Sequence, residues 1–121
     1  MDRKTLRRTS AFQARIRMSE PVWRFITTNK NDNGEVDPLQ VHLARLVHDN
    51  PEAKERILVT GDEDELDLLR DWCARMIAEG VLMRSNGKKI AGATLASEAS
   101  RVVDLIDRYD HKLQEAVRVL K

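Results

Sequence analysis

Basic side chains are the groups in this sequence best suited to chemistry with a ligand, and they are densest near its amino-terminal end. Guanidinium and ammonium groups at close spacing neutralise phosphates, so this segment is predicted to contact nucleic acid with an affinity that falls as salt rises. Two other interpretations stay open: the segment docks on acidic residues of this chain or of a second copy, or it is a solvated helix face. The predicted phosphate contacts are Arg3, Lys4, Arg7, Arg8, Arg15 and Arg17.

A second group of basic residues surrounds an Asn-Gly pair at positions 86 and 87. Asn-Gly between short apolar-polar runs is typical of a tight turn between two strands. The sequence therefore predicts a β-hairpin over about residues 81–91, with Arg84, Lys88 and Lys89 placed to contact phosphates. In the alternative, the hairpin only joins two helices of a bundle.

Residues 29–40 resemble an EF-hand calcium loop between two short helices, with Asn at the first, third and fifth positions and Gly34 at the sharp turn. The carboxylates that attract calcium are missing where they matter most. Asn29 replaces the usual first Asp, and Gln40 replaces the bidentate Glu at the twelfth position. We therefore expect an Asn-rich turn capped by Asp37 and no metal site.

The remaining polar residues form no pattern typical of an enzyme. The three histidines lack zinc-ligand spacing with one another and with Cys73. Residues 57–61 begin like a nucleotide-binding strand and turn, but acidic residues follow where glycines are needed. The expected protein is non-enzymatic and has no cofactor.

Composition favours a mainly helical protein of one domain, residues 1–121. Only 4% of the residues are aromatic and five are glycine, while Leu, Ala, Arg and Glu are abundant, which favours helices over a sandwich or barrel. The single cysteine cannot form an internal disulfide, so a reducing, cytoplasmic location is expected. No run approaches the roughly 18 apolar residues of a membrane span, so no membrane contact is expected.

The net charge of +1 conceals three opposed blocks. Residues 1–34 hold eight Lys/Arg against three Asp/Glu, residues 35–79 hold five against twelve, and residues 80–121 hold eight against five. Their charges are +5, −7 and +3. Such blocks indicate either charge matching inside the chain or two faces for two partners.

Capping signals divide the chain into helices. Residues 2–18 are mostly good helix formers, and proline follows a capping residue at Ser19-Glu20-Pro21 and Asp37-Pro38, where two further helices begin. Asn50-Pro51 predicts a short helix, after which residues 57–60 are either a strand or a last helical turn. Another helix is expected from about Asp62 to Glu79, ended by Gly80.

A long helix over about residues 95–120 is the strongest structural prediction. Its apolar residues recur in alternating steps of four and three, which is the seam of a coiled coil or a helix bundle. The stripe is too wide to face water, so it is covered either by the chain's own helices or by a second copy. The predicted oligomerisation residues are Leu95, Val102, Ile106, Tyr109, Leu113 and Leu120.

The order of elements in residues 51–121 is similar to that of winged-helix regulators: a helix ending near Gly80, a basic hairpin and a long closing helix. The resemblance implies a wing that touches phosphates and a carboxy-terminal dimer helix. One feature departs from it, because the helix in the recognition position starts with the acidic run of residues 62–65, which phosphates repel.

Together these patterns predict a small helical bundle with one short hairpin, with a possible winged-helix order. Its predicted role is that of a self-associating, non-enzymatic regulatory or accessory protein that contacts nucleic acid. The alternative is a protein–protein interaction module, such as an adaptor, an inhibitor or a small subunit of a larger complex. The expected partners are accordingly a second copy, nucleic acid or another protein.

Overall fold

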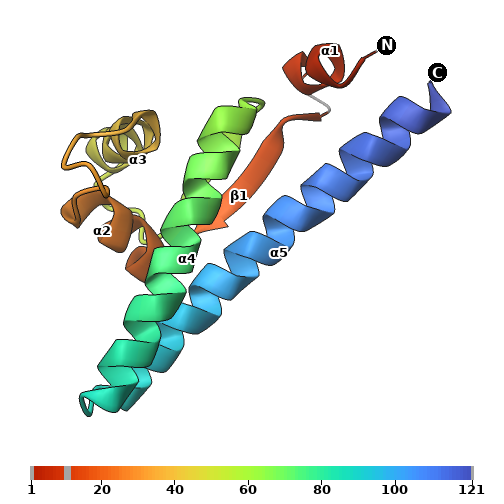
Figure 1. Ribbon diagram of the computed structural model, residues 1–121. Helices are drawn as coiled ribbons and strands as arrows, with labels where there is room; N and C mark the ends of the chain where they lie inside the picture. Colours follow the sequence, from red (N-terminus) through yellow and green to blue (C-terminus); the bar gives the residue numbers. More distant parts are fainter. Residues whose placement is uncertain (1, 10–11, 121) are drawn as a thin grey trace.

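A computed structural model of the chain describes residues 2–9 and 12–120, and the fold is mainly α, as predicted (Figure 1). A two-stranded antiparallel sheet accompanies the helices. In chain order the elements of the described residues are α1 (Arg3–Arg8), β1 (Ala14–Met18), α2 (Glu20–Thr28), α3 (Pro38–Asp49), β2 (Arg56–Thr60), α4 (Glu63–Ser85) and α5 (Lys89–Val119).

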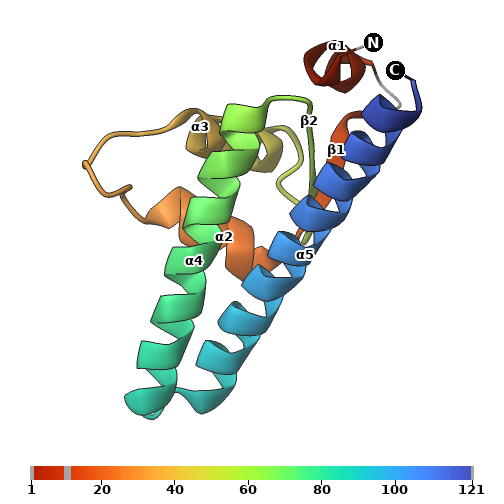
Figure 2. The same cartoon turned by 45° about the vertical axis from the view of Figure 1, so that its right-hand side comes forward.

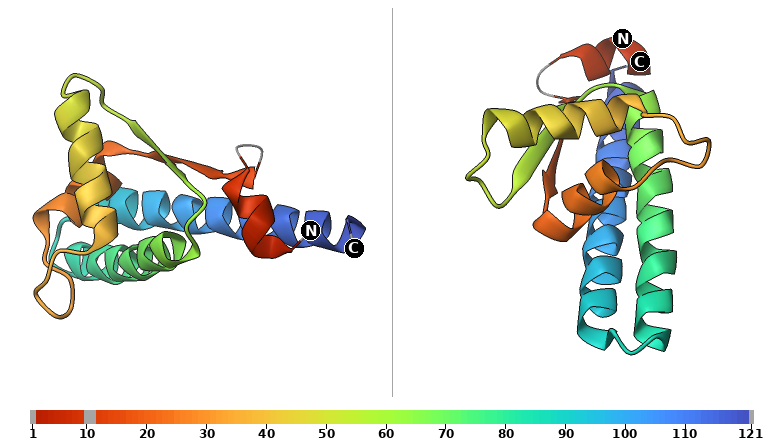
Figure 3. Two further views of the ribbon diagram at one scale, coloured as in Figure 1. Left: turned by 90° about the horizontal axis from the view of Figure 1, so that it is seen from above. Right: turned by 90° about the vertical axis from the view of Figure 1, so that its left-hand side faces the viewer.

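Helices α4 and α5 form a long helical hairpin that organises the fold (Figure 1). They lie close together near their connecting turn and diverge away from it. Helices α2 and α3 lie beside α4, and the half of the hairpin that ends in the turn projects beyond them (Figure 3). The two ends of the described chain lie together at the opposite end of the molecule from the turn.

The predicted β-hairpin at residues 81–91 is wrong in its position, because these residues form the end of α4, a turn and the start of α5. Asn86 is the C-cap of α4, and Gly87 adopts a φ of +88°, which is the conformation that ends helices. The Lys88 amide donates to the Met83 carbonyl at 2.8 Å, which closes the turn. The chain therefore has no wing at the place that the winged-helix resemblance implied.

Gly80 does not end its helix, and the last helix begins at Lys89 rather than at residue 95. Gly80 and Gly92 face each other across the hairpin, where a Cβ on Gly80 would lie 2.5 Å from the Gly92 carbonyl oxygen. Both glycines serve the close approach of two helix backbones. From the sequence alone, a glycine at a helix–helix contact cannot be distinguished from a glycine that ends a helix.

The sheet pairs β1 with β2 in antiparallel register, with Ile16 opposite Leu58. Alternate residues of β1 are buried, namely Ala14, Ile16 and Met18, and they contribute to the main core. The predicted helix over residues 2–18 is therefore correct only for α1. Residues 57–60, for which a strand and a last helical turn were both considered, belong to strand β2. The short helix predicted after Asn50-Pro51 is a turn instead.

Helix α3 begins as predicted. The Asp37 carboxylate accepts from the Gln40 backbone amide at 2.9 Å, and the Gln40 side chain accepts from the Asp37 amide at 3.0 Å, which completes a capping box. The second carboxylate oxygen of Asp37 accepts a hydrogen bond from the Trp72 indole at 2.8 Å. This contact joins α3 to the middle of α4.

The apolar seam of α5 is covered within the chain. The helix packs on α4, β1, α2 and α1, so the interpretation as a core helix accounts for most of the seam. Tyr109 is half-buried, while Leu120 is 53% exposed. Self-association stays a prediction, but these residues are not a free surface for it. The predicted oligomerisation residues buried in the core are Leu95, Val102, Ile106 and Leu113.

Candidate functional site

The amino-terminal helix α1 is held on α4 and α5 by ion pairs. Arg3 donates to Glu63 at 2.6 Å and to Asp110 at 2.8 Å, and Arg7 lies 3.0 Å from Glu63. The hydrogen bond to Glu63 raises the pKa of Arg3. Leu6 is buried beneath the helix. Acidic residues of the same chain thus neutralise part of the basic segment, which was one of the open alternatives.

The other basic residues of the amino-terminal segment are more exposed. Arg15 and Arg17 lie on the outer face of β1, where Arg17 pairs with Glu55. Lys4 and Arg15 form no ion pair within the part of the chain that the structure describes. The side chain of Arg8 lies outside the described residues.

The second basic group, Arg84, Lys88 and Lys89, lies at the turn between α4 and α5 (Figure 1). All three are exposed, and none forms an ion pair with a described residue. The turn and α1 lie at opposite ends of the molecule, so the residues predicted to contact nucleic acid do not converge on one face. They form two separate basic sites.

The loop that resembles a calcium site is held by its own hydrogen bonds. The Asn31 side chain accepts from the Glu35 amide at 2.9 Å. The Gln40 side chain donates to the backbone carbonyls of Ile26 and Asn29 at 2.9 and 2.7 Å, so it is occupied in the fold. Among the described residues no three His, Cys, Asp or Glu side chains are placed to hold a metal ion.

Two ionisable side chains have pKa values raised by burial: Cys73 lies in the core, and the half-buried Tyr109 packs against it. Burial raises the pKa of the Cys73 thiol to about 12, so it is not a ready nucleophile at neutral pH. Burial also raises the pKa of Tyr109, whose hydroxyl makes no hydrogen bond among the described residues. Neither group lines any of the pockets described below.

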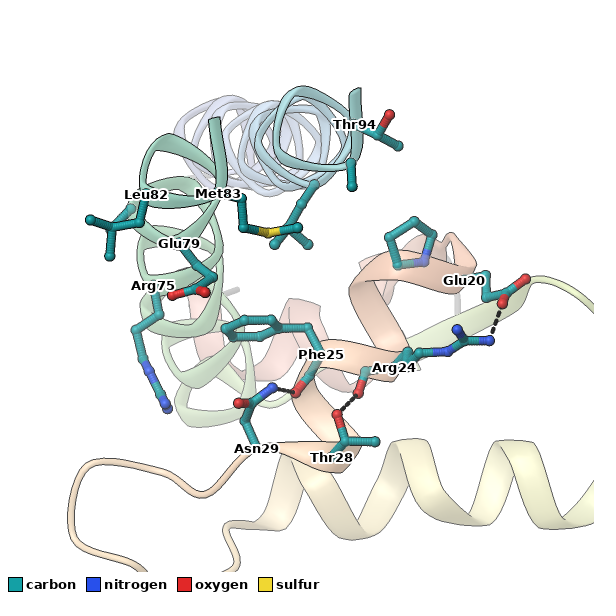
Figure 4. A pocket seen from close by; sticks show the side chains of 14 residues that line it. Glu20, Arg24, Phe25, Thr28, Asn29, Arg75, Glu79, Leu82, Met83 and Thr94 are labelled. Atoms are coloured by element: carbon teal, nitrogen blue, oxygen red, sulfur yellow. Dashed lines mark hydrogen bonds and ion pairs between the residues drawn. The ribbon is translucent and has the colours of Figure 1, made fainter. Parts of the chain in front are cut away.

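A groove with a volume of about 840 Å³ lies between α2 on one side and α4 with α5 on the other (Figure 4). Phe25 and Met83 point into it from opposite walls, and Leu82 lies at its outer rim. Its surface is largely apolar. The groove is lined by Glu20, Pro21, Arg24, Phe25, Thr28, Asn29, Arg75, Ala78, Glu79, Leu82, Met83, Ala91, Thr94 and Leu95.

The aromatic wall of the groove is fixed from behind. The Phe25 ring packs edge-on against Trp72, with the ring centroids 6.1 Å apart. The indole of Trp72 is held in turn by Asp37, and the Arg75 guanidinium lies 4.2 Å from its ring centre. This chain of contacts holds Phe25 in place, so the groove is a preformed feature of the fold.

Most polar groups along the groove are already satisfied. Arg24 pairs with Glu20, the Thr28 hydroxyl donates to the Arg24 carbonyl, and the Asn29 amide donates to the Phe25 carbonyl (Figure 4). Glu79 forms no ion pair with any described residue. The groove therefore offers apolar contact area and one free carboxylate, with few groups to orient a small polar molecule.

The groove was not predicted from the sequence. Phe25 was assigned to the buried side of a short helix, and Met83 to a strand that does not exist. One signal could have pointed to it: no charged residue occurs from Ile90 to Ser97. In the structure most of this first part of α5 is exposed, with Ile90 85% exposed.

In comparisons with known proteins, no family model, no curated protein and no solved structure matches this chain. None of the helices described is both long and apolar enough to cross a membrane. Functional inference therefore depends on the groove and on the charged surfaces of the chain itself.

Proposed function

We propose that this chain is a non-enzymatic protein-interaction module that binds an amphipathic helix of a partner protein in the groove between α2 and the α4–α5 hairpin. The observation that carries the proposal is a preformed apolar groove whose walls are helices. Helix-in-groove recognition uses such a surface to receive apolar anchors at positions i, i+3 or i+4, and i+7.

The composition of the groove favours a helix over a small metabolite. Phe25, Met83 and Leu95 supply apolar area, and methionine adapts its shape to different anchors. The hydrogen-bonding groups on the α2 wall are bonded within the chain. The unpaired carboxylate of Glu79 favours a ligand with a Lys or Arg beside its apolar anchors.

A displayed library of helices tests the proposal, with apolar residues varied at i, i+3 and i+7 and basic residues varied at the flanks. Peptides selected on the wild-type protein are measured by fluorescence anisotropy. We expect Leu82→Glu to weaken binding at least tenfold, because it places a charge at the apolar rim. The matched control is Val36→Glu, an exposed valine (73%) outside the groove, which should leave the affinity unchanged.

Two results would contradict the proposal: no peptide is enriched, or the enriched peptides bind Leu82→Glu and the wild type equally. A preference for acidic over basic flanks would contradict the assigned role of Glu79. Circular dichroism of each variant separates loss of binding from loss of fold.

Nucleic-acid contact is the second candidate function, supported by the exposed and unpaired Arg84, Lys88 and Lys89 at the turn. It is tested by binding to random duplex and single-stranded DNA at two salt concentrations. Salt-sensitive binding that is lost in Lys88→Glu/Lys89→Glu would support it. Absence of salt-sensitive binding would leave protein recognition as the function.

A further inference from the structure

A second groove lies between the last turn of α2, the loop of residues 30–36 and α3, and we call it the α3 groove. The loop projects from the side of the molecule away from α5 (Figure 2). The groove has a volume of about 660 Å³, and its surface is largely apolar. Val36 at the end of the loop is 73% exposed and Val41 on α3 is 41% exposed, and both line the groove. It therefore offers apolar contact area that no described part of the chain covers.

Hydrogen bonds within the chain fix the walls of the α3 groove. The Gln40 side chain of α3 donates to the carbonyls of Ile26 and Asn29 at the end of α2, which ties the two helices together. In the loop, the Glu35 amide donates to the Asn31 side chain at 2.9 Å. The groove is therefore a preformed surface, and binding a ligand requires little ordering of the protein.

Most carboxylates near this loop are engaged elsewhere. Asp32 lies 3.7 Å from the Arg75 guanidinium and lines a different pocket, beside α4. Asp37 is occupied by the cap of α3 and by the Trp72 indole. Glu35 remains as the one carboxylate among the described residues that line the α3 groove.

Two cationic side chains line the same groove, Lys30 from the loop and Arg45 from α3. Both are exposed, and neither forms an ion pair with a described residue. His48 also lines the groove, but it lies 3.4 Å from Asp49. With two unpaired cations against the single carboxylate of Glu35, the lining complements a ligand of negative charge.

We infer that the α3 groove binds an acidic segment of a partner protein. A branched apolar side chain of that segment packs against Val36 and Val41. Its carboxylates lie beside Lys30 and Arg45. The exposed valines favour a protein segment over nucleic acid, because nucleic acid is held mainly through its phosphates, which gain nothing from contact with valine.

The α3 groove and the groove between α2 and the α4–α5 hairpin favour ligands of opposite charge. Glu79 favours basic residues in the hairpin groove, whereas Lys30 and Arg45 favour acidic residues in the α3 groove. Among the residues that line them, the two grooves share only Thr28 and Asn29. They are separate sites, so this inference does not rest on the proposed function. Together they would let one chain join two partner segments of opposite charge.

A displayed library of short peptides tests the inference on the full chain, with Val, Ile or Leu at the centre and either acidic or basic residues at the flanks. We expect acidic flanks to be enriched, and fluorescence anisotropy measures the affinity of the selected peptides. Val36→Glu should weaken their binding at least tenfold, because it removes an apolar contact and adds a charge of the same sign. The matched control is Leu82→Glu in the hairpin groove, which should leave their affinity unchanged. Peptides of the hairpin groove should respond in the opposite way, so failure of one proposal is distinguished from failure of the other.

A charge reversal tests the role of the cations. Arg45→Glu should weaken binding of the acidic peptides about tenfold, because it replaces an attraction with a repulsion of similar size. The same variant should bind peptides with basic flanks more tightly than the wild type does. The matched control is Arg108→Glu, since Arg108 is exposed on α5 and lines neither groove, and it should change neither affinity.

Three results would overturn the inference: no acidic peptide is enriched, the selected peptides bind Val36→Glu as tightly as the wild type, or Arg45→Glu behaves like Arg108→Glu. Random duplex DNA that binds the wild type but not Arg45→Glu, with no peptide enriched, would assign the cations to nucleic acid instead. Because the substituted side chains are exposed, thermal unfolding of each variant should match the wild type and show that the fold is intact.

Discussion

The contact between Gly80 and Gly92 makes a prediction opposite to the usual effect of replacing glycine in a helix. In an open helix Gly→Ala stabilises by about 1 kcal/mol, because alanine has the higher helix propensity. At Gly80 the added Cβ would lie 2.5 Å from the Gly92 carbonyl oxygen and 2.9 Å from the Ala96 Cβ, whereas ordinary contacts begin at 3.4 Å. The helices must separate by about 0.9 Å at this point, the difference between 3.4 and 2.5 Å.

The expected result is a net loss of stability in Gly80→Ala. Overpacking costs about 1–3 kcal/mol, and the upper end applies because a backbone oxygen cannot rotate away. Subtracting the propensity gain of about 1 kcal/mol leaves a loss of about 2 kcal/mol in the free energy of unfolding. Urea denaturation should show a lower midpoint at an unchanged slope.

The matched control is Ala44→Gly at an exposed position of α3, which should lose only about 1 kcal/mol through helix propensity. The reasoning is refuted if Gly80→Ala is as stable as the wild type or more stable. That result would mean that the hairpin helices are not in backbone contact.

Three further predictions concern the core and α1. Asp37→Ala should lower the free energy of unfolding by about 2–4 kcal/mol, because it removes the α3 cap and leaves the Trp72 indole without its acceptor. Urea denaturation measures this loss, which should be smaller in Asp37→Asn. Burial raises the pKa of Cys73 to about 12, against 9.0 in the unfolded chain. The thiol therefore ionises first in the unfolded chain, so the free energy of unfolding is unaffected below pH 9 and falls as pH rises from 9 toward 12. Between pH 8 and 10 the wild type should lose about 1.4 kcal/mol more than Cys73→Ala, and an equal loss in both contradicts the assignment. Gly61→Ala should release α1, because the added Cβ would collide with the Arg7 carbonyl oxygen. Limited trypsin digestion should then cleave within α1 faster than in the wild type. Unchanged cleavage would contradict the contact.

The helices were predictable where local chemistry and tertiary structure agree. Asp37-Pro38 begins α3 as its capping signals indicate, and the seam of α5 is continuous because one side of that helix is buried over most of its length. The choice between a core helix and a dimer helix could not be made from the pattern, because either partner covers the same stripe.

The strands and the turn could not be read from local preference. Residues 14–18 contain alanine, arginine and methionine, which favour helices, and only the alternation of buried and exposed residues marks β1. Asn86-Gly87 suits both a hairpin between strands and the end of a helix, because both use a positive φ at glycine. The contacts that decide between these structures come from distant parts of the chain.

The groove could not be predicted from the sequence for a similar reason. Phe25 and Met83 are 58 positions apart, and only the packing of α2 against the hairpin brings them to facing walls. The ion pairs of α1 were foreseen as one alternative, since the middle block of the chain is acidic, but the identity of Glu63 and Asp110 as partners required the fold.

The position of β1 has a consequence for how the chain reaches its native state. This strand is made early in synthesis, but Ala14 pairs with Thr60, and the Arg17 carbonyl accepts from Arg101, a residue 84 positions later. The backbone of β1 must stay without its strand partner until residues 56–60, about half of the chain, have left the ribosome, and without Arg101 for longer still. Because such long-range contacts close slowly, sheet formation is expected to limit the folding rate, with the unpaired strand exposed to association with other nascent chains in the meantime.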